Sequence, residues 1–192
     1  VEMRSYTNRK LIGTTTDDAI GEAFDKVARE CGLEYPGGPN VQKQAEKGEV
    51  KYKFTNMDKE KIKDFNFSYS GLKTAVINFI HNEKQRGNEI RRADLAHSFQ
   101  YVAVDQLVRK TELAITKYGV KKMIIAGGVS ANKYIRGKIA EVCEKHGVEL
   151  SVPAFKYCTD NAAMIGAAAY PLYKDGKFAD LDLNATSRDE IY

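Results

Sequence analysis

One short segment constrains the fold more than any other, because a buried strand, two glycines and a helix follow one another within it. Lys122–Ala126 has the apolar pattern of a buried strand, Gly127 and Gly128 end it, and a helix is expected over Ala131–Lys145. A second strand is expected at Val148–Val152. Strand, helix and strand joined by short connections favour a parallel pair with a right-handed crossover. The sequence therefore predicts an α/β fold.

The rest of the chain is expected to be mostly helical. Strands are expected at Val1–Tyr6 and Lys10–Thr14, and helices from Thr16–Asp17 to Cys31, from Arg91 to Tyr118 and from Asp160 to Tyr173. The aromatic and hydroxyl-rich segment Phe65–Thr74 is expected to lead into a further helix that runs through Ile80. Gly32 has the position of a helix C-terminal glycine. Tyr35–Pro39 predicts a stiff, tight turn, because proline fixes its torsions and the two glycines allow positive φ. An irregular tail is expected from Lys174.

Composition limits the class of protein. With 192 residues, 43% of them hydrophobic, the chain is long enough for one well-packed core. It has no run of about 18 apolar residues, so we expect no membrane span. Cys31, Cys143 and Cys158 are odd in number and show no C-x-x-C spacing, so neither a disulfide framework nor a zinc knuckle is expected. We therefore expect a reducing, cytoplasmic location. Val1 falls inside an expected strand, so we expect further residues upstream of it.

The net charge of +4 comes from 30 basic and 26 acidic side chains. This mild excess is compatible with a nucleic-acid partner, although many ordinary enzymes match it. Basic residues gather in Lys43–Lys63 and near Arg91 and Arg92, where a solvated helical face is the simpler interpretation.

The turn Ala126–Asn132, A-G-G-V-S-A-N, is the first candidate site. Missing side chains at Gly127 and Gly128 let a ligand approach the backbone, and free N–H groups at a helix start suit a phosphate or a ribose hydroxyl. Asn132 can both donate and accept hydrogen bonds there. The alternative is a glycine pair that only allows tight strand–helix packing. The segment is not a P-loop and lacks the G-x-G-x-x-G spacing.

Asp160, in Y-C-T-D-N-A-A-M, is the second candidate. A carboxylate at the mouth of the next helix is either its N-cap or a hard ligand for a metal ion. One carboxylate cannot hold a metal alone, and His81, His97 and His146 show no ligand spacing among themselves.

Acidic residues at the start of the first helix form the third candidate. Asp17 is expected to cap that helix, and Asp18, Glu22 and Asp25 share one of its faces by their spacing of four and three. The default interpretation is a solvated acidic face. Beside the turn Pro36–Pro39, Asp25 could instead bind sugar hydroxyls.

Taken in order, these segments resemble the C-terminal part of the tRNA threonylcarbamoyladenosine transferase family, formerly labelled glycoprotease or O-sialoglycoprotein endopeptidase. The resemblance spans about Val1 to Tyr173. It rests on D-D-A-I-G-E-A-F-D-K with Y-P-G-G-P, F-S-Y-S-G-L-K-T, A-D-L-A-H-S-F-Q, A-G-G-V-S-A-N-K-Y-I-R and C-T-D-N-A-A-M.

The resemblance implies an actin-like ATPase fold of the ASKHA, ribonuclease-H-like type, with a nucleotide cleft between two lobes. Residues 1–157 would be mostly the second lobe, with a helical insertion at about 40–92, and residues 158–192 a C-terminal helix and tail packing on the first lobe. Family members transfer a threonylcarbamoyl group from threonylcarbamoyl-AMP to the exocyclic amine of the adenosine next to the tRNA anticodon. The partners implied are tRNA, a smaller paralogue and an ATPase subunit, with no membrane involved.

By motif, Asp25, Gly38 and Asn132, with Gly127 and Gly128, would bind the adenylate or ATP. Asp160 would be one ligand of a divalent metal, iron (Fe²⁺) or zinc. The family's two histidine ligands, H-x-x-x-H, and its S-G-G-H-T segment are not in this chain, which alone is expected to be inactive and to hold metal poorly. Gln42 stands where the family often has an acid, so a ribose contact from it is doubtful.

No general base is identified, so the catalytic residues are unknown. A non-catalytic paralogue that scaffolds the same complex is one alternative, against which C-T-D-N with Asp160 counts. A sugar-kinase-like ATP-binding protein of the same fold is another, but such a kinase does not require Y-P-G-G-P or F-S-Y-S-G-L-K-T. A peptidase activity has no support, because the chain has no zincin helix or nucleophile–base pair.

Overall fold

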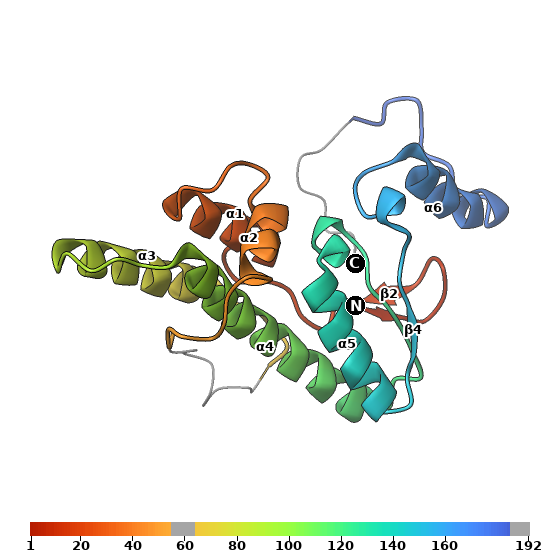
Figure 1. Ribbon diagram of the computed structural model, residues 1–192. Coiled ribbons are helices and arrows are strands. Elements are labelled where there is room, and N and C mark those ends of the chain that lie inside the picture. The colour runs from red at the N-terminus through yellow and green to blue at the C-terminus, as the bar shows by residue number, and fades with distance from the viewer. Residues whose placement is uncertain (55–63, 185–192) are drawn as a thin grey trace.

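A computed structural model describes residues 1–54 and 64–184 and has an α/β architecture, as expected (Figure 1). Its strands are β1 (Glu2–Met3), β2 (Arg9–Lys10), β3 (Lys122–Ile124) and β4 (Glu149–Ser151). Its helices are α1 (Ile20–Glu30), α2 (Gly37–Ala45), α3 (Ser70–Gln85), α4 (Arg92–Tyr118), α5 (Lys133–Lys145) and α6 (Ala162–Lys174), with short 3₁₀ turns η2 (Gly128–Ala131) and η3 (Phe155–Tyr157).

The expected strand–helix–strand unit is present, and its two strands are parallel. Lys122 lies opposite Glu149, and Ile124 lies opposite Ser151, with α5 connecting the strands. The N-terminal strands β1 and β2 are antiparallel and much shorter than expected. The chain turns back between them, where the amides of Arg4 and Ser5 both donate to the carbonyl of Asn8.

Helix α4 joins two hydrophobic clusters. Its first half packs with α1, α2 and α3, where the rings of Phe99 and Phe24 meet edge to face at 4.9 Å. Its second half contributes Val104 and Ile115 to a cluster with α5 and β4. Gly119, at φ 61°, ends the helix in the left-handed conformation. The expected span of this helix is confirmed, and the helix contributes side chains to both clusters (Figure 1).

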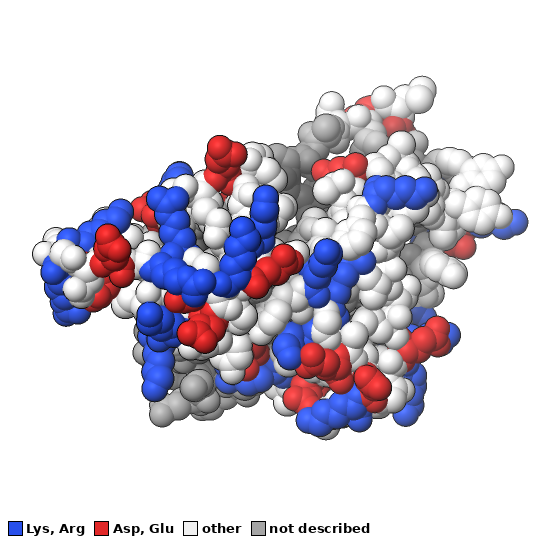
Figure 2. Space-filling model, in the orientation of Figure 1, with Lys and Arg blue, Asp and Glu red and all other residues white. Residues whose placement is uncertain are grey.

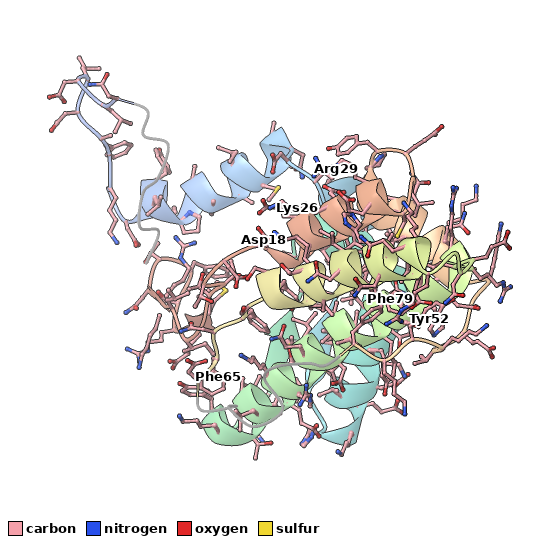
Figure 3. The ribbon with its side chains drawn as sticks, turned by 90° about the vertical axis from the view of Figure 1, so that its left-hand side faces the viewer. Asp18, Lys26, Arg29, Tyr52, Phe65 and Phe79 are labelled. Carbon is pink, nitrogen blue, oxygen red and sulfur yellow. The ribbon has the colours of Figure 1, made fainter. Side chains whose placement is uncertain are left out.

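Residues 51–54 pack against α3 and α4. The ring centroids of Tyr52 and Phe79 are 4.8 Å apart (Figure 3). Those of Phe54 and Phe79 are 5.6 Å apart, with the two rings edge to face. The amides of Lys51 and Tyr52 both donate to the hydroxyl of Ser98 on α4. Of the basic stretch Lys43–Lys63, the last part lies outside the described residues.

The expected start of α1 at Thr16–Asp17 is wrong. The helix begins at Ile20, with Ala19 in the N-cap position and no side-chain cap. Both earlier residues have partners far along the chain, because Thr16 donates its amide to the carbonyl of Phe67 and Asp17 bonds to the start of α3. Distant partners therefore override the local capping pattern. Helix α3 also continues past its expected end, to Gln85.

Helix α6 stands apart from the helical body (Figure 1). It has no buried residue, although its sequence is A-A-M-I-G-A-A-A-Y-P-L-Y-K. Its exposed large apolar side chains are Met164, Ile165, Tyr170, Leu172 and Tyr173. No helix within residues 1–54 and 64–184 is both long enough and apolar enough to span a bilayer.

Candidate functional site

The glycine turn after β3 is open on its outer side. Gly127 has φ 87°, which a residue with a side chain rarely adopts. Both Gly127 and Gly128 are exposed, and a Cβ added at either would have no atom of the described residues within 4 Å. Strand–helix packing therefore does not explain Gly128, and the backbone of the turn is open on this side.

Ser130, on the same turn, carries an unsatisfied polar group. Its side chain is buried, and its hydroxyl has no hydrogen-bond partner among the described residues. A buried hydroxyl without a partner is costly and marks a place where a ligand or an ordered water completes the bonding. Ser130 could not be singled out from its residue type, since serine is common in turns.

Asn132 is the N-cap of α5 and is 9% exposed. Its Oδ1 accepts from the amide of Ile135 at 3.1 Å, and its Nδ2 donates to Oε1 of Gln100 at 3.1 Å. These bonds fix the side chain and still leave one N–H and one lone pair of its amide for another partner. Its contact with a nucleotide stays a prediction.

Asp25 shapes the start of α2. Its Oδ1 accepts from the amides of Gly37 at 2.8 Å and Gly38 at 3.3 Å, and within the described chain its Oδ2 accepts no hydrogen bond. A Cβ on Gly37 would lie 2.5 Å from the Cα of Asp25, so only glycine fits there. The expected tight turn over Tyr35–Pro39 is wrong, since Gly37 and Gly38 belong to the first turn of α2 and neither uses the positive φ that glycine allows. Gly38 has open space beside it.

Two contacts bring these elements against the glycine turn. A Cβ on Gly21 of α1 would lie 2.9 Å from Cγ2 of Val129. The amide of Lys133, at the start of α5, donates to Oε1 of Gln42 on α2 at 2.9 Å. The side chain of Gln42 is therefore already used in joining α2 to α5. Three segments far apart in sequence are thus in contact: α1, α2, and the glycine turn with the start of α5.

Asp160 lies in the exposed loop before α6 and is not its N-cap. Asn161 has that position, and its Oδ1 accepts from the amide of Met164 at 3.1 Å. The capping alternative for Asp160 is therefore wrong, and its carboxylate makes no hydrogen bond or ion pair with any described residue. No three His, Cys, Asp or Glu side chains gather as a metal site in the described part of the chain. Any metal held by Asp160 needs ligands from outside these residues.

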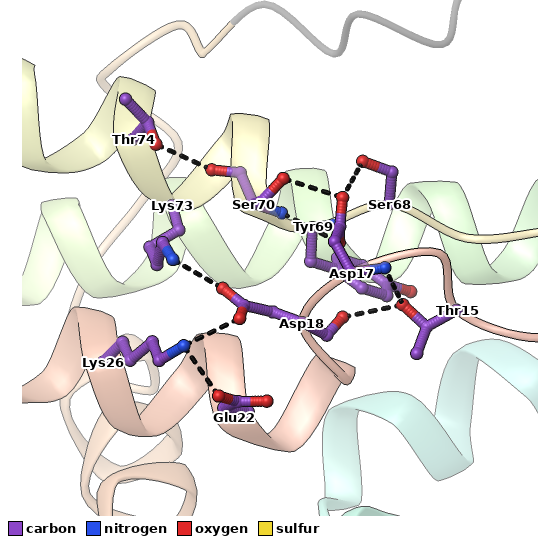
Figure 4. Close-up of polar contacts among 10 residues, drawn as sticks. All are labelled: Thr15, Asp17, Asp18, Glu22, Lys26, Ser68, Tyr69, Ser70, Lys73 and Thr74. Carbon is purple, nitrogen blue, oxygen red and sulfur yellow. Dashed lines mark hydrogen bonds and ion pairs between the residues drawn. The ribbon is translucent and has the colours of Figure 1, made fainter.

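The acidic residues before and within α1 split into separate contacts (Figures 3 and 4). Asp18 forms ion pairs with Lys26 at 2.7 Å and Lys73 at 2.6 Å, and Glu22 pairs with Lys26 at 2.6 Å. Hydrogen bonds from Lys26 and Lys73 lower the pKa of Asp18. The expected acidic face shared with Asp25 is absent, because Asp18 precedes the helix and Asp25 bonds to α2.

Asp17 is the N-terminal cap of α3. Its Oδ1 accepts from the amides of Tyr69 at 2.8 Å and Ser70 at 3.2 Å, and its Oδ2 accepts from the hydroxyls of Ser68 and Ser70 (Figure 4). Burial raises the pKa of Asp17, but these four hydrogen bonds outweigh it and lower the pKa from 3.8 to about 2. These bonds, with the ion pair between Asp18 and Lys73, hold the D-D pair before α1 against the F-S-Y-S-G-L-K-T segment at the start of α3.

Charge does not separate into one basic face in the view of Figure 2. Lysine and arginine side chains there alternate with aspartate and glutamate over the helical body. This mixed surface fits the interpretation of the basic residues as solvated helical positions.

Comparisons with known proteins agree with one family. The family model described as tRNA N6-adenosine threonylcarbamoyltransferase matches residues 1–167. A protein of that name from Staphylococcus saprophyticus is 48% identical over 191 residues, covering 100% of this chain and 56% of the relative. One from Staphylococcus aureus strain Newman is 47% identical over 193 residues, with the same coverage. The chain thus spans about half the length of the curated relatives it matches.

Proposed function

The chain belongs to the tRNA N6-adenosine threonylcarbamoyltransferase family, and from this premise we propose that it is the C-terminal part of such an enzyme. The enzyme would transfer a threonylcarbamoyl group from threonylcarbamoyl-AMP to the exocyclic amine of the adenosine next to the anticodon of tRNA. The observation that carries the proposal is that α1 and α2, which hold Asp25 and Gly38, both contact the open glycine turn or the start of the helix that follows it. The free thiols of all three cysteines fit a cytoplasmic location.

The adenylate end of the substrate would bind at the glycine turn. Gly127 and Gly128 leave the backbone open to it, and the buried hydroxyl of Ser130 offers an unused polar group. Asp25 would contribute Oδ2 to a ribose hydroxyl, since its Oδ1 is bonded to the start of α2. Asn132 would contribute the remaining capacity of its amide.

Asp160 would contribute one carboxylate to an iron or zinc site at the other end of the substrate. Its exposure and lack of partners fit a ligand whose companions come from the rest of the protein, but the described residues offer no complete set. When bound, the metal would supply Lewis-acid stabilisation of developing negative charge in acyl transfer. The residues of this chain would bind and orient the nucleotide, and the site would empty when AMP leaves after the transfer. No general base is assigned among them.

An actin-like fold of two lobes is the architecture we propose for the complete protein. Residues 1–157 would form mostly the second lobe, with α2 and α3 belonging to a helical insertion at about 40–92. Residues 158–192 would pack on the first lobe. The support is α6, whose apolar side chains are exposed in this chain and would gain a partner there.

The test is a transfer assay on the complete protein with its smaller paralogue, its ATPase partner and unmodified tRNA. Mass spectrometry of the digested tRNA should find threonylcarbamoyladenosine, and Asp160→Ala should abolish it together with bound metal while the fold persists. Asn132→Ala should weaken binding of AMP measured by calorimetry. A complex active only through another subunit would favour the scaffold alternative, and phosphorylation of a sugar without tRNA modification would favour the kinase.

A further inference from the structure

The segment between β4 and the end of α6 buries one side chain. From residue 151 to residue 174, Cys158 is the only buried residue, at 2% exposed. Its thiol donates to the carbonyl of Ala154 at 3.6 Å and accepts an N–H from Arg136 at 3.1 Å. The loop that carries Asp160 is therefore packed onto the protein through one buried thiol, whose hydrogen bonds are satisfied.

Arg136, in the first turn of α5, reaches both sides of this junction. Its Nη2 also donates to the carbonyl of Pro153 at 3.0 Å, and its Nε donates to the carbonyl of Ser130 in the glycine turn. The guanidinium carbon lies 4.2 Å from the centroid of the Phe155 ring. One planar group thus contacts the glycine turn with one edge and the Pro153–Cys158 segment with another edge and a face.

Arg136 also makes the connection to the earlier part of the chain. Among the residues that the structure describes, every hydrogen bond between residues 153–161 and an element that precedes them comes from Arg136. Asp160 is only two residues beyond Cys158, so the position of its backbone depends on this junction.

We propose that Arg136 is a positioning residue, which holds the Asp160 loop at a fixed place relative to the turn from Gly127 to Asn132. The roles of the Asp160 loop as a metal site and of the turn as a nucleotide site rest on the proposed function. The contacts that Arg136 makes between them do not depend on it. A ligand on a loop needs supports of this kind, because small displacements of a carboxylate weaken metal binding and misplace the substrate. Lysine could not replace Arg136, since a single ammonium cannot bond to the turn and the loop from one rigid plane.

The first experiment uses the reactivity of Cys158 in the folded protein. Arg136→Met and Arg136→Lys should each speed alkylation of Cys158 by iodoacetamide roughly tenfold or more, because the loop opens locally. Buried Cys31 and Cys143 serve as internal references and should not change. Arg29→Met, an equal change at a highly exposed arginine, is the control. Unchanged Cys158 reactivity in Arg136→Met would overturn the proposal, and full protection in Arg136→Lys would overturn the need for the planar group.

The second experiment asks whether Arg136 acts through Asp160. Zinc affinity of the complete protein is measured for Asp160→Ala, Arg136→Met and the double variant, with circular dichroism to confirm folding. Both single variants should lose affinity, and the double variant should bind no worse than Asp160→Ala. Additive losses would show that Arg136 does not act through Asp160. If Asp160→Ala binds zinc normally, the proposed metal site fails, while the Cys158 result still decides the junction.

Discussion

At the scale of single residues, Asp17 shows how one carboxylate can order two segments. It lies before α1 in sequence and accepts four hydrogen bonds from Ser68, Tyr69 and Ser70 at the start of α3. Orphan amides at a helix start favour a negative partner, and the helix dipole adds to this. The same bonds give Asp17 its low pKa.

Asp17→Ala should lower the free energy of unfolding by about 1 kcal/mol, or roughly 2–4 °C in Tm. The carboxylate is exposed, so solvent screening keeps the loss below what its full pKa shift would imply. Because folding depresses its pKa from 3.8 to about 2, the stabilisation is complete above pH 4 and is lost as the pH falls toward 2. Urea unfolding from pH 2 to pH 7 measures this. Exposed Glu89→Ala is the control, and a difference that persists unchanged at pH 2 would contradict the cap.

Gly37 and Gly38 are neighbours, but only Gly37 is packed so closely that a side chain does not fit. Gly37→Ala should cost about 1–3 kcal/mol, since its Cβ would collide with the backbone of Asp25. Gly38→Ala should leave stability unchanged or raise it by up to about 1 kcal/mol, because nothing is near and alanine favours helix. Urea midpoints of both variants give the comparison. Equal losses would mean that the contact with Asp25 does not decide the residue at position 37.

At the scale of elements, local patterns predicted what local forces determine. The span of α4, the pairing of β3 with β4 and the glycine turn between β3 and α5 follow from periodicity and from the pair Gly127 and Gly128. The starts of α1 and α2 did not follow, because their boundaries depend on bonds from Asp17 to α3 and from Asp25 to Gly37. Contacts 12 or more residues apart leave no periodic trace in the sequence.

The candidate site divides in the same way. Gly127 could be predicted, since a strand that turns at once into a helix demands unusual torsions. Ser130 and Arg136 could not, because their importance lies in an unsatisfied hydroxyl and in bonds to a loop that begins 17 residues beyond Arg136. Sequence alone does not show whether Asp160 or Asn161 caps α6, because both residue types are strong N-caps.

The cap of α6 gives a test at this scale. Asn161→Ala should fray the first turn of α6, with amide exchange there roughly fivefold faster, the equivalent of about 1 kcal/mol. Asp160→Ala should leave that exchange unchanged, since its carboxylate does not bond to the helix. Hydrogen exchange followed by mass spectrometry measures both. Equal fraying in Asp160→Ala would return Asp160 to capping and remove the free carboxylate that the metal proposal needs.

At the scale of the whole molecule, α6 is the element that the rest of the chain does not explain. The other helices bury apolar side chains in the two clusters joined by α4, whereas α6 buries none. An apolar helix exposed in this way is typical of an element whose partner is elsewhere. The relatives are longer than this chain, which covers 56% of their length. Their further residues are the partner that we propose for α6.

Ile165 can decide this, because it is 72% exposed in the chain. Ile165→Glu should leave the Tm of the 192-residue chain unchanged, since the side chain loses no packing there. In the complete protein the same change should cost about 2 kcal/mol or more, because a buried aliphatic side chain would be replaced by a charge. Thermal unfolding of both forms provides the comparison, with exposed Lys174→Glu, at the end of the same helix, as the control for charge. A complete protein that tolerates Ile165→Glu would leave α6 exposed there too, and its apolar surface would then have to serve a partner protein.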